Sequence, residues 1–267
     1  MTLRYSAHLN TLYGAVPWPS RPARAAGDGF GCVELWAPPA DQREVLALEL
    51  DRLALEVACV NTAEGPYADD FGQLGNPAAA AWWREDFRQT LAFARRIRAG
   101  AINVLAGGRL AGSSRGNQLA TAHANLAWAL TTLREGDPQL LLEPLNAADR
   151  RSPLLRGVDD ARALIDRLDR PGSLRLLFDA YHLFQEESDL LAVLRDAEDC
   201  IGHIQIADWP GRGRPGTGRI PFPELLDAIE RLGYDGWIGL EHFPHPAEEP
   251  TVPPAPHRRT AATGGPA

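Results

Sequence analysis

LRLLFDAYHLFQEESDLLAVLRDAEDCIGHIQIAD, residues 174–208, contains two apolar runs separated by a helical stretch. The first run, Leu174–Phe178, and the second, Ile201–Ile206, are largely apolar throughout and do not alternate strictly with polar residues. Such runs are typical of parallel strands that are buried on both faces of a sheet. A helix near Leu190–Arg195 would supply the crossover that parallel strands require. This stretch therefore predicts one β/α repeat of an α/β protein.

The same repeat continues in both directions along the chain. Helical patterns separate the strands, as over Ala81–Arg98, where apolar residues recur at intervals of three and four. Repeats of this kind along 267 residues predict a closed (β/α)8 TIM barrel, with a doubly wound open sheet as the alternative. The predicted strands are Tyr5–Leu9, Cys32–Trp36, Val57–Asn61, Ala101–Leu105, Leu140–Glu143, Leu174–Phe178, Ile201–Ile206 and Trp237–Leu240.

The barrel is expected to form a single domain over residues 1–244. Beyond it, residues 245–267 are rich in proline, alanine and glycine and show no apolar periodicity. A segment of this composition cannot bury enough apolar surface to offset the entropy lost on ordering. We therefore expect residues 245–267 to be a flexible C-terminal tail.

Composition and charge argue against several classes of protein. The 27 basic and 35 acidic side chains give a net charge of −8, whereas a nucleic-acid binder normally carries a basic face. No apolar run approaches the roughly 20 residues of a membrane span, and the opening MTLRYSAHLN lacks the apolar core of a signal peptide. The three cysteines have no zinc-site spacing and suggest reduced thiols. We expect a cytoplasmic protein with a small-molecule partner, and neither a nucleic acid nor a membrane.

Four predicted strands end in side chains that can bind a metal. LLLEP contributes Glu143, LRLLFDAYH contributes Asp179, IGHIQIAD contributes Gln205 and WIGLEH contributes Glu241. In a TIM barrel the C-terminal ends of all strands meet at the active-site face, so these four side chains should converge. Carboxylate and amide oxygens suit a hard divalent cation. The sequence thus predicts a divalent metal site at this face.

A metal site of this kind suits proton transfer beside a carbonyl group. A cation that chelates adjacent substrate oxygens would stabilise an enediolate as charge develops. Glu143 and Glu241, on either side of the substrate, could then move a proton between two carbons. These two glutamates are therefore the predicted catalytic residues.

Two further side chains are candidates for binding substrate. His182 follows Asp179 in the motif DAYH and could donate a hydrogen bond to a substrate oxygen, or cap the loop. Arg212, in the loop WPGRGRPGTG, could clamp a substrate carboxylate, or belong to a solvated basic turn. His203 shares a strand face with Gln205 but lies deeper in the barrel, and we expect it either to have a structural role or to support the residues of the site from behind.

Several motifs resemble those of one enzyme family. EPLN, FDAYH, GHIQIADWPGR followed by PGTG, and RLGYDGWIGLEH resemble the hydroxypyruvate isomerase family, which belongs to the xylose isomerase-like (β/α)8 barrels. The opening YSAHLNTLYG resembles its first strand and loop. The likeness spans about Leu3–Pro244 and is densest from Leu140 onward.

The resemblance implies a cofactor, a ligand set and a reaction class. The cofactor would be a divalent cation, Mg²⁺ or Mn²⁺, held by Glu143, Asp179, Gln205 and Glu241, with the two glutamates carrying the proton transfer. Members interconvert hydroxypyruvate and tartronate semialdehyde, or isomerise 2-oxo-tetronates. Barrels of this family often pair, so a homo-oligomer is compatible with the resemblance, although no sequence feature marks an interface.

The sequence departs from the family pattern around the expected mouth of the barrel. The departures leave the predicted metal ligands in place and bear on which substrate fits, because loops at the mouth set specificity. An epimerase or dehydratase of a sugar or keto-polyol therefore stays as an alternative, as does a non-catalytic sugar-binding barrel. The departing residues are Trp209, Gly213, Arg214, Arg219 and Phe243, together with the motif NTAEG after the third strand.

Overall fold

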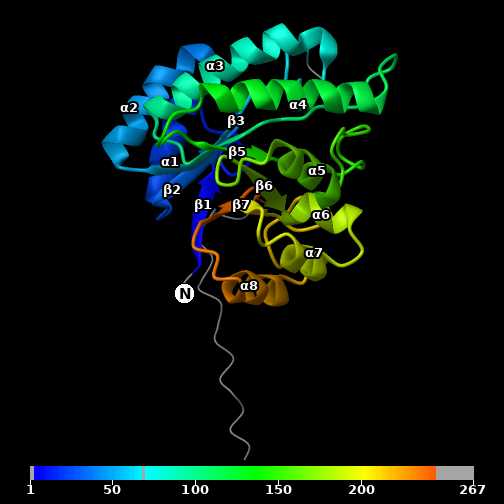
Figure 1. Cartoon of the computed structure of the whole chain (residues 1–267). Coiled ribbons are helices and arrows are strands. Elements are labelled where there is room, and N and C mark those ends of the chain that lie inside the picture. The colour runs from blue at the N-terminus through cyan, green and yellow to red at the C-terminus, as the bar shows by residue number, and fades with distance from the viewer. Residues whose placement is uncertain (1–2, 68–69, 245–267) are drawn as a thin grey trace, which may run out of the picture.

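The computed structural model describes residues 3–67 and 70–244, and its strands form one closed parallel barrel (Figure 1). Each strand pairs with the next along the chain, and β1 pairs with β8 from Arg4↔Trp237 to Ala7↔Leu240. This closing pair confirms the TIM barrel and rules out the open sheet. The expected tail, residues 245–267, lies outside the described residues. The strands are β1 (Arg4–His8), β2 (Cys32–Leu35), β3 (Glu56–Asn61), β4 (Ala101–Asn103), β5 (Gln139–Leu142), β6 (Leu174–Asp179), β7 (Ile201–Ile206) and β8 (Trp237–Leu240).

Helices surround the barrel and return the chain from one strand to the next (Figure 1). One of them, α6, was missed from the sequence because its seven residues follow Asp179 directly and are too few to show a helical period. Asp179 itself begins this helix, since its Oδ1 accepts a hydrogen bond from the Tyr181 amide at 2.8 Å. The helices are α1 (Arg21–Gly27), α2 (Arg43–Leu53), α3 (Ala80–Arg96), α4 (Arg115–Thr132), α5 (Val158–Leu168), α6 (Ala180–Glu186), α7 (Leu190–Asp196) and α8 (Phe222–Arg231), with 3-10 turns η1 (Trp18–Ser20), η2 (Ala40–Gln42) and η3 (Pro77–Ala79).

Side-chain alternation along the strands separates an outer core from the barrel interior. In β5, Leu140 and Leu142 belong to the large core against the helices, whereas Leu141 faces inward. A residue two positions beyond an inward residue also faces inward, which directs Glu143 and Asp179 toward the barrel axis. The inward apolar residues form a small separate cluster of Cys59, Ala101, Leu141 and Leu177.

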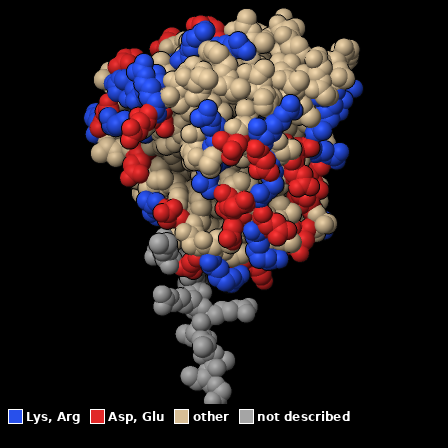
Figure 2. All heavy atoms as spheres, in the orientation of Figure 1, with Lys and Arg blue, Asp and Glu red and all other residues tan. Residues whose placement is uncertain are grey.

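Charges of both signs are interspersed on the face shown in Figure 2. Ion pairs such as Arg96–Asp51 at 2.7 Å and Arg162–Asp199 at 2.8 Å join neighbouring elements at the surface. Pairs of this kind stabilise a fold little, but they break the surface into small patches of both signs. Among residues 3–67 and 70–244, no helix is long and apolar enough to cross a membrane.

Candidate active site

The predicted ligands lie together at the C-terminal end of the barrel. Glu143 directly follows β5, Asp179 ends β6, Gln205 is the penultimate residue of β7, and Glu241 directly follows β8. All four side chains are buried. The register places Asp179 beside Gln205 across the β6–β7 pair. The strand ends therefore bring these side chains to one place, as the alternation of the apolar strands predicts.

Arg212 links two of the carboxylates. Its Nη2 lies 3.0 Å from Glu241 Oε1 and 3.3 Å from Asp179 Oδ2, and its Nε donates to the Glu241 carbonyl at 3.1 Å. Burial works against the charge of this guanidinium, but Glu241 and Asp179 outweigh it and raise the pKa of Arg212 above its ordinary value. Arg212 is thus a largely buried cation among acids, with its side chain 12% exposed, and the solvated turn that the sequence left open is wrong.

Glu241 is held in place by groups from the first two strands. Trp36 Nε1, just after β2, donates to Glu241 Oε1 at 3.0 Å. His8 Nε2, from β1, lies 3.7 Å from the same oxygen, and burial lowers the pKa of His8 below its ordinary value. The backbone amide of Thr11 donates to His8 Nδ1 at 3.3 Å, so the neutral ring carries its proton on Nε2. Oε1 of Glu241 therefore faces three donors.

His182 is fixed as a neutral donor at the same site. The backbone amide of Asn146 donates to His182 Nδ1 at 3.2 Å, which places the ring proton on Nε2. Nε2 lies 3.8 Å from Glu143 Oε1 and 3.7 Å from Asp179 Oδ2. Burial, reinforced by Arg212, lowers the pKa of His182 well below its ordinary value. His182 consequently presents an N–H to the space between the two carboxylates.

The surroundings of two of the carboxyl groups raise their pKa values. Burial, and then repulsion by Glu241 and Asp179, raises the pKa of Glu143 well above its ordinary value, although Asn103 Nδ2 donates to its Oε2 at 2.7 Å. Burial, opposed by Arg212 and aided by Glu241, raises the pKa of Asp179 to about 7. Buried carboxylates that repel one another are stabilised by a cation among them.

The charge and chemistry of the site fit a divalent cation. When ionised, Glu143, Asp179 and Glu241 contribute −3 and Arg212 contributes +1, which leaves −3 + 1 = −2. The neutral histidines do not change this sum. In addition, Oε1 of Gln205 is buried and accepts no hydrogen bond from the described residues. Hard divalent cations prefer oxygen ligands. A buried amide oxygen that accepts no hydrogen bond, close to an excess of carboxylates, therefore suits such a cation.

Two clusters of potential ligands have atoms within 4.8 Å of one another, namely His8, Glu34 and Glu241, and Glu143, Asp179 and His182. The histidines are poor ligands here, because in both the Nε2 that faces the carboxylates carries a proton. Glu34 is also engaged elsewhere, since His203 Nε2 lies 2.7 Å from its Oε2 and Gln205 Nε2 donates to its Oε1 at 3.0 Å. The oxygens that remain for a cation, such as Oε1 of Glu143 and Oε1 of Gln205, therefore belong to the strand-end residues.

Comparison with known proteins agrees with this geometry. A family model of xylose isomerase-like TIM barrels matches residues 22–261. The hydroxypyruvate isomerase of Escherichia coli (strain K12) is 35% identical over 92% of this chain and 96% of its own length. The 2-oxo-tetronate isomerase of Cupriavidus necator is 34% identical over 90% of this chain and 93% of its own. The chain belongs to the hydroxypyruvate isomerase family of xylose isomerase-like barrels. Because these relatives are isomerases, the chain is an enzyme of the isomerase class.

The barrel is also shared with epimerases. A solved structure of an L-ribulose 3-epimerase matches with a TM-score of 0.75 and 26% sequence identity, covering 90% of this chain and 82% of its own. Members of the hydroxypyruvate isomerase family and this epimerase thus use one scaffold, and fold alone does not decide the reaction.

The sequence patterns of this family member did not identify several residues of the site. Trp36 and Asn146 follow β2 and β5 in the loops at the mouth, and Asn103 ends β4. Glu34 could have been found, because a carboxylate inside the apolar run CVELW must face the barrel interior if Val33 and Leu35 face the helices. The expected structural role of His203 agrees with its bond to Glu34.

Most of the departures from the family pattern lie on the loop after β7. There, the guanidinium of Arg219 lies 5.0 Å from the ring centroid of Trp209, and Trp209 also contacts Phe184 at 6.1 Å between ring centroids. Phe243, after β8, is about half exposed. In this hydroxypyruvate isomerase family member, aromatic and cationic groups therefore stand near the mouth.

Proposed function

We propose that this protein is a metal-dependent isomerase of hydroxypyruvate or a closely related small 2-oxo acid. The observation that carries the proposal is the pair Glu143 and Glu241, which come from strands on different sides of the barrel and border one small space with His182 and Arg212. The relatives named as hydroxypyruvate and 2-oxo-tetronate isomerases support the substrate class.

Glu143, Asp179, Gln205 and Glu241 would hold the cation, for which Mg²⁺ or Mn²⁺ suits the oxygen donors. When bound, the cation would polarise the substrate carbonyl and stabilise the enediolate. The net charge of −2 and the free Oε1 of Gln205 support this assignment. Asp179 contributes through Oδ2, because its Oδ1 caps α6.

Proton transfer falls to the two glutamates. One carboxylate removes a proton from C3 of hydroxypyruvate, and the other glutamate, which starts the turnover protonated, delivers its proton to C2 of the enediolate. Proton exchange with solvent then restores the two glutamates to their starting states. A second proton moves from the C3 oxygen to the C2 oxygen, which completes tartronate semialdehyde with atoms balanced. His182 Nε2–H would donate to a substrate oxygen, and Arg212 would pair with the substrate carboxylate.

Product analysis tests this assignment. Incubation with Mn²⁺ and a panel of small 2-oxo acids and ketoses in deuterated water should convert a 2-oxo acid into its 2-hydroxy-3-oxo isomer, with deuterium at the C2 that receives the proton. Inversion of one stereocentre in a ketose would identify an epimerase, which the likeness to an L-ribulose 3-epimerase keeps in view. Release of water would identify a dehydratase, and binding without exchange would identify a non-catalytic barrel.

Metal affinity should depend on pH in a definite direction. The pKa of Asp179 is raised to about 7 in the metal-free site, so below pH 7 a cation must displace a proton that Asp179 has taken up. We expect the Mn²⁺ affinity to fall by about tenfold for each pH unit below 7 for each proton displaced. The raised pKa of Glu143 acts in the same direction.

Calorimetry at pH 5.5, 6.5 and 7.5 measures this dependence. Repeating the titration in buffers with different ionisation enthalpies counts the protons released on binding. An affinity that stays constant across this range would show that the carboxyl groups of the metal-free site are already ionised, contrary to the prediction.

A further inference from the structure

Glu34 is a fully buried carboxylate that the proposed reaction does not use. It lies in β2 and points into the barrel, one layer below the strand-end residues. Burial alone would raise the pKa of Glu34, but the charge and hydrogen bond of His203 bring that pKa below its ordinary value. A buried charge costs stability unless it is paired, so its presence inside the barrel calls for a function.

Both carboxylate oxygens of Glu34 have defined partners. His203 Nε2 lies 2.7 Å from Oε2, and Ser6 Oγ donates to the same oxygen at 3.3 Å. Gln205 Nε2 donates to Oε1 at 3.0 Å. On the neighbouring strand, Gly239 leaves the room that this carboxylate occupies, because a Cβ at that position would collide with it. The strands therefore form a fitted cavity for one carboxylate.

The orientation of the Gln205 amide follows from this contact. An ionised carboxylate only accepts hydrogen bonds, so the NH₂ of Gln205 must turn toward Glu34 and its Oε1 must turn away. That Oε1 is the buried oxygen without a donor among the described residues. An unconstrained amide could present either end to the site, and an NH₂ group cannot bind a cation.

We propose that Glu34 is a positioning residue that locks the Gln205 amide with its oxygen toward the metal site. The inference rests on the proposed metal-dependent function. Glu34 acts through Gln205 rather than as a ligand, since its own oxygens are occupied by Gln205, His203 and Ser6. A ligand held by an outer hydrogen bond is fixed in orientation, and loss of such a partner typically lowers metal affinity by about 10–100-fold.

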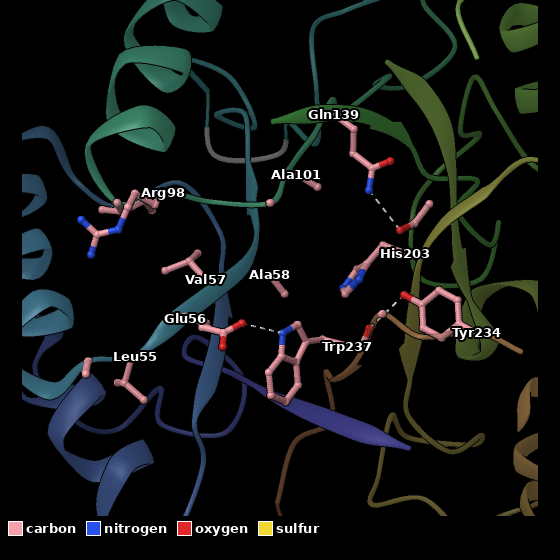
Figure 3. Close-up of a pocket in the computed structure, with 15 residues that line it drawn as sticks. Leu55, Glu56, Val57, Ala58, Arg98, Ala101, Gln139, His203, Tyr234 and Trp237 are labelled. Atoms are coloured by element: carbon pink, nitrogen blue, oxygen red, sulfur yellow. Dashed lines mark hydrogen bonds between the residues drawn. The ribbon is translucent and has the colours of Figure 1, made fainter. Parts of the chain in front are cut away.

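His203 anchors Glu34 from the other side. Figure 3 shows the ring of His203 facing a pocket at the opposite end of the barrel, near Gln139 and Trp237. Its Nε2 reaches Glu34, so the order through the barrel is pocket, His203, Glu34, Gln205 and the metal site. The imidazole pairs with the buried charge and stops the carboxylate from turning away from Gln205.

Two substitutions of Glu34 distinguish the effect of its hydrogen-bond acceptor on metal binding from the effect of its charge. Glu34→Met has a side chain of similar length but no hydrogen-bond acceptor, so nothing would fix the orientation of the Gln205 amide. Mn²⁺ should therefore bind about 10–100-fold more weakly. Glu34→Gln removes the charge but keeps an oxygen that accepts from Gln205, while its NH₂ donates to His203 in the other ring tautomer. It should bind Mn²⁺ within about threefold of the unaltered chain. Ser6→Ala, which removes a Glu34 contact without touching Gln205, should also keep its affinity.

The Mn²⁺ affinity of each variant is measured by calorimetry and by electron paramagnetic resonance. Thermal unfolding of each metal-free variant measures its stability. Equal weakening in Glu34→Met and Glu34→Gln would assign the effect to charge and overturn the proposal. Unchanged affinity in Glu34→Met, with only a lower unfolding temperature, would reduce Glu34 to a structural role and overturn it as well. If the unaltered chain binds no Mn²⁺, the proposed metal site itself fails, which is a distinct outcome.

Discussion

Glutamine in place of Glu143 or Glu241 should lower the rate of isomerisation, and of deuterium exchange into product, by about 10²–10⁴-fold. Each substitution keeps the side-chain volume and one side-chain oxygen, but it removes the carboxyl group that can take up and release a proton. Both residues are buried and border the same space, so a solvent molecule or another side chain cannot simply replace them. The measurement is single-turnover exchange at saturating Mn²⁺, which separates the proton transfer from weaker metal binding.

An exposed glutamate away from the site supplies the matched control. Glu85, on α3, is exposed and pairs with Arg88 at 3.2 Å, so Glu85→Gln should leave the exchange rate within a few-fold of the unaltered enzyme. Glu143→Gln should also stabilise the metal-free fold at neutral pH, because the raised pKa of Glu143 means that its ionised form opposes folding there. Full activity in both Glu143→Gln and Glu241→Gln would end the proposed mechanism.

Much of the site was predictable because two periodicities act together. The strand–helix repeat brings the ends of successive strands to one face, and the two-residue alternation decides which strand-end residues point inward. Glu143, Asp179, Gln205 and Glu241 satisfy both conditions, so their convergence could be expected from the sequence. The α6 helix was missed, because its seven residues are too few to show a helical period, even though Asp179 caps its first turn.

The partners of these residues depend on contacts between strands that are distant in the sequence. Trp36 reaches Glu241, and Asn146 sets the tautomer of His182, through hydrogen bonds that no local pattern reveals. Whether Arg212 lies in a solvated turn likewise depended on where its loop folds back. Only the closed barrel brings that loop against Asp179 and Glu241.

Removal of divalent cations should abolish turnover and destabilise the fold. With its carboxyl groups ionised, the metal-free site would carry a formal charge of −2, and the raised pKa values of Glu143 and Asp179 reflect their burial and that repulsion. A cation present at about 100 times its Kd would contribute about 2.7 kcal/mol to the free energy of unfolding. For a domain of this size, that corresponds to a rise of roughly 5–10 °C in the unfolding midpoint.

This expectation is tested by measuring the unfolding midpoint and the activity after treatment with a chelator. Both are then measured again after addition of Mn²⁺ or Mg²⁺. Glu143→Gln is the informative comparison, because it removes one ligand charge and part of the repulsion. Its midpoint should therefore rise less on addition of Mn²⁺ than that of the unaltered enzyme. A chelated enzyme that keeps its full rate would show that the carboxylates act without a cation. Arg212, the cation already among them, would then be the group that offsets the charge of the enediolate.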